Sequence, residues 1–228
     1  MKKIGIVFAM IEELEEFLKL VELKKEYELF DLKFYECNYN KVECILVESG
    51  IGKVNSARAT QILIDNYKVD YVFNVGVAGG LKEELNTCDI VVGKNLVQHD
   101  FDLTPFDHEK GFIPNVGKYI ECDEYLVNLT KNIDAGCNIF YGTIASGDIF
   151  VTDRNMADKI STKFDALCTE MEGASIAQVC YLSHIPFLVI RSISDSPNGN
   201  NNLTFDEFLL KSSKMVAKFT LQLLSKIG

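Results

Sequence analysis

The stretch that most clearly indicates the fold is DYVFNVGVAGG, which spans residues 70–80. Asp70 to Val75 form a mostly apolar run rich in β-branched and aromatic residues, which is typical of a strand buried on both faces. The glycine-rich segment Gly76 to Gly80 follows without a break, and residues this small let backbone N–H groups approach a ligand closely. The stretch therefore predicts a central buried strand that ends where a small ligand can bind.

Strand and helix patterns alternate along the rest of the chain. The other expected strands cover residues 3–9, 27–37, 42–48, 89–97, 138–145, 166–169 and 186–193. The expected helices cover residues 12–20, 53–67, 121–131, 153–163, 173–182 and a final segment opened by a capping box at Thr204 and Glu207. This alternation predicts an α/β fold with a mixed, mostly buried sheet flanked by helices on both faces. No linker or repeat interrupts it, so residues 1–228 are expected to form a single domain.

The composition argues against several classes of protein. The chain has 23 basic and 33 acidic residues, hence a net charge of −10, and the basic residues include only three arginines. Such a chain is poorly suited to bind the phosphate backbone of nucleic acids. No apolar run approaches the roughly 18 residues needed to cross a bilayer, and the first ten residues read as a strand rather than a signal peptide. We therefore expect neither a nucleic-acid nor a membrane partner.

The cysteines indicate a reducing compartment. There are seven of them, an odd number without any CxxC pair, and most lie within or beside apolar runs. This pattern is typical of buried thiols rather than of disulfides or a metal site, so we expect a cytoplasmic protein.

Acidic residues follow three of the expected strands. Glu12 and Glu13 come after the first strand, Glu170 and Glu172 flank Met171 at a strand-to-helix junction, and Asp195 ends the segment RSISD that begins at Arg191. Ligands of such sheets bind outside the carboxyl ends of the strands. Several carboxylates at that edge suggest acid–base chemistry on an uncharged bond, such as a glycosidic bond.

Two other motifs are less specific. The segment SGIGKVN at residues 49–55 lacks the third glycine of a dinucleotide-binding loop and also fails the P-loop pattern, which leaves a tight turn and a small-ligand loop equally favoured. His99, Asp100, Asp102, Asp107 and His108 lie in a long loop without a constrained ligand spacing, so a surface or interface loop is a better interpretation than a metal site. We expect no metal and no cofactor.

Taken together, these motifs resemble the 5′-methylthioadenosine/S-adenosylhomocysteine nucleosidases of the purine and uridine nucleoside phosphorylase superfamily. The resemblance extends almost from end to end and rests on seven landmarks in order. They are Gly5–Met10 with Glu12-Glu13, Ser49–Val54, Asn74–Gly80, Ser146–Asp148 with Phe150, Glu170–Glu172, Arg191–Asp195 and Phe205–Phe208. The resemblance implies a nucleoside phosphorylase-like three-layer sandwich.

The resemblance also implies a role for each landmark residue. Glu13 would activate the attacking water, and Asp195 would protonate purine N7, with Ser194 positioning it. Glu172 and Met171 would hold the ribose while Arg191 orients Glu172. Phe150 would stack on adenine, and the backbone of Val151 would bond to its edge. The remaining pocket residues would be Ile51, Val77 and Phe205.

The implied reaction is hydrolysis of the N-ribosidic bond of 5′-methylthioadenosine and S-adenosylhomocysteine, which releases adenine for methionine salvage and S-adenosylhomocysteine recycling. Val77 replaces a hydroxyl residue common in the family, a departure shared with relatives that also cleave 6-amino-6-deoxyfutalosine, so this substrate stays open. One alternative is a phosphate-dependent phosphorylase, but the loop after the first strand and Phe73-Asn74 lack the arginines that hold phosphate. A non-catalytic nucleoside-binding protein is disfavoured because it needs neither Glu13 nor Asp195.

The long loop after the strand that ends near Gln98 predicts a homodimer. It carries more apolar surface than a solvated loop needs, from Phe101, Leu103, Pro105, Phe106, Phe112, Ile113 and Pro114. The resemblance implies that residues 101–114 of the partner complete the active site. Leu103, Phe106 and Pro114 would then form the apolar wall around the 5′-alkylthio group.

Overall fold

The computed structural model describes residues 1–195 and 205–227, with the side chains of the second part described from Phe208 onward. Ten strands form one sheet in the order β10-β6-β8-β9-β5-β1-β4-β3-β2, with β7 paired to β6. The strands are β1 (Lys2–Phe8), β2 (Glu22–Leu29), β3 (Leu32–Tyr39), β4 (Val42–Glu48), β5 (Tyr71–Gly80), β6 (Ile90–Gln98), β7 (Ile120–Glu121), β8 (Ile139–Ser146), β9 (Ala166–Glu170) and β10 (Phe187–Asp195).

The sheet is mixed and closes on itself in part. β1 runs parallel to β4 and β5, and β10 runs parallel to β5 but antiparallel to β6. Because β10 pairs with both β5 and β6, the strands β10, β6, β8, β9 and β5 form a closed circuit. This closure brings the ends of strands that are distant in the sequence to one place.

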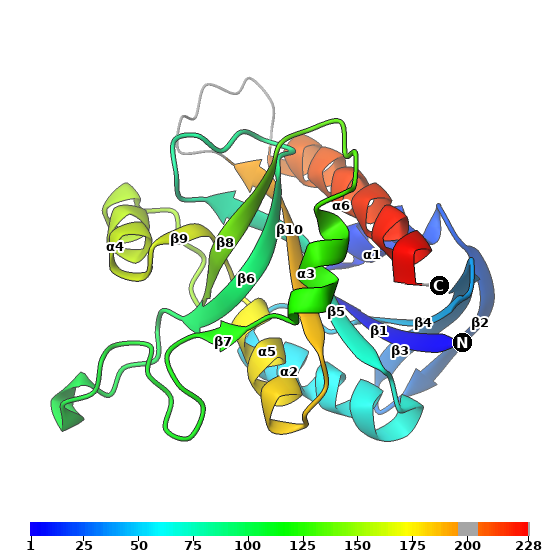
Figure 1. Ribbon diagram of the computed structural model, residues 1–228, viewed down its shortest axis with the longest axis horizontal. Helices are drawn as coiled ribbons and strands as arrows, with labels where there is room; N and C mark the ends of the chain where they lie inside the picture. The colour runs from blue at the N-terminus through cyan, green and yellow to red at the C-terminus, as the bar shows by residue number, and fades with distance from the viewer. Residues whose placement is uncertain (196–204, 228) are drawn as a thin grey trace.

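Helices cover both faces of the sheet. They are α1 (Ile11–Leu18), α2 (Lys53–Ile62), α3 (Glu124–Thr130), α4 (Arg154–Phe164), α5 (Gly173–Leu182) and α6 (Phe205–Ile227). On one face α1 packs against the long α6, and on the other α2 packs against α5, while α4 lies beside β8 and β9 (Figure 1). The expected α/β fold with a mixed sheet between helices is confirmed.

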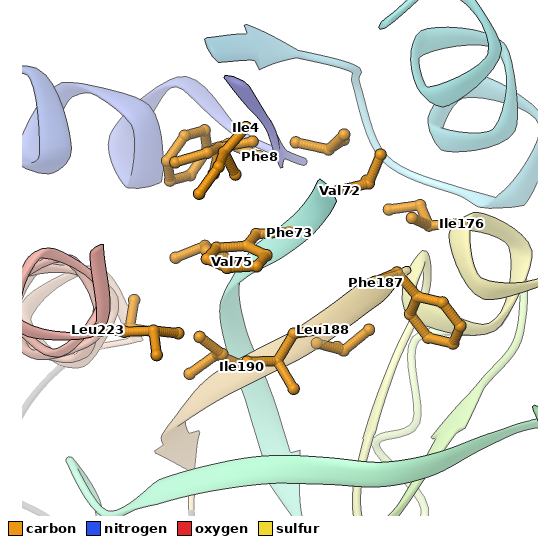
Figure 2. Close-up of a cluster of buried hydrophobic side chains, with 14 of the residues drawn as sticks. Ile4, Phe8, Val72, Phe73, Val75, Ile176, Phe187, Leu188, Ile190 and Leu223 are labelled. Carbon is orange, nitrogen blue, oxygen red and sulfur yellow. The ribbon is translucent and has the colours of Figure 1, made fainter. Parts of the chain in front are cut away.

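The core fills both sides of the central strands. Phe73 in β5 and Ile190 in β10 point toward α6, where Leu223 meets them, whereas Phe187 points toward Ile176 in α5 (Figure 2). All five side chains are buried. Alternate residues of these strands therefore contact opposite helical layers, which explains why the strands read as nearly continuous apolar runs.

The structure corrects several expected boundaries. The strand expected over residues 27–37 is a hairpin of β2 and β3, because Phe30 and Asp31 both adopt positive φ angles, 54° and 57°, and reverse the chain. β2 is mostly exposed and charged, so its sequence lacks the apolar alternation of a strand. The helix expected from residue 121 begins at Glu124, where the Asp123 side chain caps it.

Other expectations differ in smaller ways. The glycine-rich segment after Val75 continues β5 as far as Gly80 instead of leaving the sheet. The helix expected over residues 53–67 ends as a π-helical turn, Leu63–Tyr67. The long loop holds a 3₁₀ turn, Thr104–Phe106, which projects at the lower left of Figure 1. The expected capping box depends on Thr204 and on the side chain of Glu207, which lie outside the described part of the chain.

Candidate active site

A pocket opens at the carboxyl ends of six strands. Its walls come from the segments that follow β1, β4 and β8 and from the ends of β5, β9 and β10. The lining residues are Ala9, Met10, Glu13, Ile51, Val77, Ala78, Gly79, Ile149, Phe150, Val151, Thr169, Glu170, Met171, Glu172, Ser194 and Asp195. This is the edge of the sheet where the sequence places the acidic residues.

Glu13 is a buried carboxylate held by the backbone. It sits in the first turn of α1, where its Oε2 accepts hydrogen bonds from the N–H groups of Ala9 at 3.0 Å and Met10 at 3.1 Å. Its Oε1 accepts from the N–H of Val77 in β5 at 2.9 Å. Burial raises the pKa of Glu13, while the charge of Arg191 and these three donors oppose the rise. Glu13 is therefore a fixed carboxylate with an enhanced affinity for protons.

Arg191 is the buried centre of the acidic cluster. Its side chain is 1% exposed, and its Nη2 donates to Glu170 and to the side-chain oxygen of Asn74. The Oε2 of Glu172 lies 3.5 Å from the same nitrogen. The resemblance implies that Arg191 orients Glu172, and the structure adds Glu170 as a closer partner.

Glu170 ties the cluster to the backbone. It accepts from the N–H groups of Glu172 at 3.0 Å and Gly173 at 2.7 Å, and the hydroxyl of Ser146 donates to its other oxygen. These bonds hold the turn between β9 and α5, and so fix where Glu172 points. The resemblance implies no role for Glu170, although its place two residues before Glu172 was the available signal in the sequence.

The cluster holds more negative than positive charge. Glu13, Glu170 and Glu172 surround one guanidinium, so full ionisation leaves the group with excess negative charge in a buried place. Burial and the neighbouring Glu170 raise the pKa of Glu172 to about 7, against the opposing effect of Arg191. The site can therefore exchange a proton near neutral pH, as acid–base catalysis requires.

Gly76 and Gly79 leave room for charged side chains of the adjacent strand. Arg191 lies directly across from Gly76 in the β5–β10 pairing, and Asp195 lies across from Gly79. A Cβ at Gly76 would overlap the Arg191 guanidinium and the Glu13 carboxylate, and a Cβ at Gly79 would approach Asp195 to 3.3 Å. The absence of a side chain at Gly76 and Gly79 thus leaves space for Arg191, Glu13 and Asp195, and the N–H of the neighbouring Val77 bonds to Glu13.

Asp195 stands at the pocket mouth. It is exposed at the end of β10, and its Oδ1 accepts a 2.7 Å hydrogen bond from the hydroxyl of Ser194. Ser194 and Asp195 both line the pocket, so this hydrogen bond fixes the Asp195 carboxylate at its edge.

Apolar side chains form the outer wall. Ile51, Ile149 and Phe150 line the pocket and are exposed, with Phe150 65% exposed. Val151 and Met171 lie deeper and are half-buried. An exposed aromatic ring beside a row of carboxylates is suited to stack on a flat, polar ring system.

Among the described side chains, four expected residues do not line this pocket: the buried Arg191, Leu103, Phe106 and Pro114. Leu103, Phe106 and Pro114 belong to the projecting loop of their own chain, where Phe106 is 73% exposed. Phe205 begins α6, but its side chain lies outside the described residues. Thr169 was missed, and its buried hydroxyl has no hydrogen-bond partner within the described part of the chain.

In residues 1–195 and 205–227, no three His, Cys, Asp or Glu side chains are grouped as metal ligands would be. Over the same residues, no helix combines the length and apolar character of a membrane span.

Comparison with known proteins gives one consistent family. The model of the phosphorylase superfamily matches residues 3–226. A 5′-methylthioadenosine/S-adenosylhomocysteine nucleosidase of Exiguobacterium is 39% identical, over 97% of this chain and 98% of the relative.

Solved structures agree. The enzyme of that name from Helicobacter pylori, in complex with a pyrrolidine inhibitor, superposes with a TM-score of 0.93 at 40% identity and 98% coverage of both chains. A structure described as futalosine hydrolase of the same organism has a TM-score of 0.92 at 40% identity, over 98% of this chain and 97% of that one. With this fold and these carboxylates at the strand ends, the chain belongs to the 5′-methylthioadenosine/S-adenosylhomocysteine nucleosidase family of the phosphorylase superfamily.

Proposed function

We propose that this enzyme hydrolyses the N-ribosidic bond of 5′-methylthioadenosine and S-adenosylhomocysteine and releases adenine, in methionine salvage and S-adenosylhomocysteine recycling. The observation that carries the proposal is the pocket itself, in which Glu13, Glu172 and Asp195 face one space beside the exposed ring of Phe150. Cleavage of this bond builds positive charge on the sugar and negative charge on the departing base. Carboxylates beside the sugar stabilise the positive charge, and a proton donor beside the base neutralises the negative charge.

Glu13 is the proposed general base. Its carboxylate is fixed by three N–H donors and its pKa is raised by burial, which makes it a better proton acceptor than an exposed carboxylate. A water between Glu13 and the ribose carbon would lose its proton as it attacks. The positive charge that develops on the sugar is stabilised by the same carboxylate.

Glu172 and Met171 are the proposed ribose contacts. Glu172 Oε1 accepts from the N–H of Gly52 at 2.9 Å, and its other oxygen faces Arg191, so both oxygens are oriented before a ligand arrives. A carboxylate held in this way can accept hydrogen bonds from sugar hydroxyls. Such preorganisation lowers the free-energy cost of fixing the sugar for attack.

Asp195 is the proposed acid. Its carboxyl would give a proton to purine N7 and accept from the exocyclic amine, while Phe150 stacks on the ring and the Val151 backbone bonds the ring edge. Ser194 already orients one oxygen of Asp195 through its 2.7 Å hydrogen bond. Protonation lets the base leave as neutral adenine rather than as an anion.

A phosphorylase would need a cationic site for phosphate, and the positions of the arginines argue against one. Arg191 is surrounded by carboxylates, Arg58 donates to the carbonyl of Phe30, and Arg154 pairs with Asp158 at 3.0 Å. The pocket beside Glu13 is lined by acids, which repel a dianion. Water is therefore the favoured nucleophile.

Hydrolysis should be independent of phosphate. We expect adenine release from 5′-methylthioadenosine at the same rate with and without phosphate, and methylthioribose as the sugar product in both cases. Adenine is followed by absorbance and the sugar by mass spectrometry. A sugar product found as its 1-phosphate, and only when phosphate is present, would assign the chain to the phosphorylases instead.

Further candidate substrates share the adenine and the ribose and differ in the group at the 5′ position of the sugar. The related structure described as futalosine hydrolase supports a test of 6-amino-6-deoxyfutalosine, which carries the same adenine and ribose but a larger 5′ group. The proposed catalytic residues act on the shared part. We therefore include this compound in the proposed substrate range.

We propose that the active form is a homodimer in which residues 101–114 of the partner complete the pocket. Exposed apolar side chains support this: Ile51 and Phe150 line the pocket, Val54 is exposed near the start of α2, and Phe106 projects on its loop. Solvent contact of this extent is unfavourable for a monomer. Leu103, Phe106 and Pro114 of the partner would cover the 5′-alkylthio group.

Replacing Phe106 with alanine should raise KM for 5′-methylthioadenosine by roughly tenfold or more, because an apolar contact to the thioether is lost. Adenosine, which has a 5′-hydroxyl, should be much less affected and serves as the control substrate.

Subunit mixing tests the crossing of the loop. One chain carries Asp195→Asn and the other Phe106→Ala, so a shared-site dimer gains one intact site and partly recovers thioether activity. A monomer in sedimentation, or no recovery after verified subunit exchange, would contradict the shared site.

We also propose a cytoplasmic location. All seven cysteines are unpaired, which supports a reducing compartment.

A further inference from the structure

The amino end of α2 is held by side chains from two other loops. Gly52 occupies the N-cap position and offers no side chain to the free N–H groups of the first turn. The carboxylate of Asp148 accepts from the N–H of Lys53 at 2.8 Å, and the carboxylate of Glu172 accepts from the N–H of Gly52 at 2.9 Å. Two successive backbone donors thus bind two carboxylates from distant parts of the chain.

An ion pair joins α2 to a third loop, the one that follows β6. The ammonium group of Lys53 lies 2.8 Å from Asp100 Oδ1 and 3.1 Å from the side-chain oxygen of Gln98. Asp100 Oδ2 accepts from the N–H of Asp148 at 2.9 Å. Lys53 and Asp100 are mostly buried, with side chains 19% and 17% exposed. Lys53, Asp100 and Asp148 therefore form a closed network, which we call the α2 clamp.

The α2 clamp bears directly on the ribose contact. Gly52 adopts a φ of 102°, and its N–H is the donor that fixes Oε1 of Glu172. Lys53 is the next residue, so the position of this N–H depends on how the clamp holds Lys53. Removal of the clamp would leave α2 in place through its packing on α5, yet free the Gly52 peptide to turn away from Glu172.

We propose that Lys53 and Asp100 are positioning residues for sugar recognition, which act through the Gly52 N–H to hold Glu172 toward the ribose hydroxyls. The proposal rests on the proposed function of Glu172 as a ribose contact. It assigns a role to the landmark residues Lys53 and Asp148 that the catalytic scheme leaves unused. It also links Asp100, at the start of the projecting loop, to the sugar site through Lys53 and the Gly52 N–H.

The test compares ribose with deoxyribose substrates. Glu172→Gln first identifies which hydroxyl, 2′ or 3′, Glu172 contacts, from the loss of kcat/KM with 5′-methylthioadenosine and with its 2′-deoxy and 3′-deoxy analogues. Asp100→Asn and Lys53→Met should then lower kcat/KM for the ribonucleoside by roughly tenfold, the size expected for one weakened hydrogen bond to a carboxylate. The analogue that lacks the identified hydroxyl should change less than about twofold.

A double-mutant cycle separates positioning from general damage. In Glu172→Gln, the further change Asp100→Asn should cost little, because both act through the same contact. The control variant is Lys2→Met, which removes the 3.1 Å ion pair between Lys2 and Asp70. Neither residue lines the pocket, so the ratio of kcat/KM for the ribonucleoside to kcat/KM for the deoxy analogue should stay unchanged. Melting temperatures of all variants report on folding.

Two results would overturn the proposal. One is an equal loss with the ribonucleoside and the deoxy analogue, and the other is full additivity of Asp100→Asn with Glu172→Gln. Failure of the proposed function is separate, since it shows as no adenine release by the unaltered protein. In that case, dissociation constants of adenosine and its deoxy analogues are measured in place of kcat/KM. Equal loss of affinity for both, or full additivity of the two substitutions, would again overturn the proposal.

Discussion

Replacement of Asp195 by asparagine should lower kcat for 5′-methylthioadenosine by at least about 10²-fold, the minimum expected for loss of a general acid. Asparagine keeps the shape and can still bond the base, but it has no carboxyl proton to give to N7. Substrate affinity should therefore change by less than about tenfold, since the loss falls on the transition state. Steady-state kinetics and equilibrium titration of the nucleoside measure the two effects.

A substrate with a better leaving group provides the control. The 4-nitrophenyl riboside that carries the same 5′-methylthio group releases a stable phenolate, which needs no proton from the enzyme. Its hydrolysis should be much less impaired in Asp195→Asn. If the variant keeps more than about a tenth of the original kcat with 5′-methylthioadenosine, Asp195 is not the acid.

Glu13→Gln should stop turnover of every substrate, including the 4-nitrophenyl riboside, because an amide cannot accept a proton from the attacking water. The change should also lower the melting temperature. Glu13 receives N–H groups at both oxygens, from Ala9 and Met10 at one and from Val77 at the other, so the amide nitrogen of glutamine must face a donor. An unmet buried donor costs about 1–3 kcal/mol.

Glu12→Gln is the matched control for this prediction. Glu12 is the preceding residue, exposed in the first turn of α1, where a negative charge interacts only weakly with the helix dipole. Its replacement should leave kcat unchanged and the melting temperature nearly so. If the two variants behave in the opposite way, the base is Glu12 and the proposed mechanism is wrong.

Much of the architecture was predictable from local sequence patterns. The buried strands β5 and β10 begin with apolar runs, and they end at Gly80 and Asp195. Burial on both faces produces such runs, so the α/β fold follows from the pattern. Parallel strands end at a common edge, which is why the acidic residues after β1, β9 and β10 were expected together.

The charged, exposed strand β2 was not predictable in this way, since its pairing with β3 depends on backbone hydrogen bonds and a two-residue reversal rather than on an apolar face.

What the sequence by itself determined is the order of the buried strands and of the helices, the edge at which the pocket forms and the presence there of Glu13, Glu172 and Asp195. Only the tertiary structure decided how these groups are oriented. The register of β10 on β5 sets Arg191 beside Gly76, where its guanidinium reaches Glu170 and Asn74, and the 1% exposure of Arg191 makes those partners obligatory. Register, burial and the distance between charges depend on residues far apart in the chain, and local patterns carry no information about them.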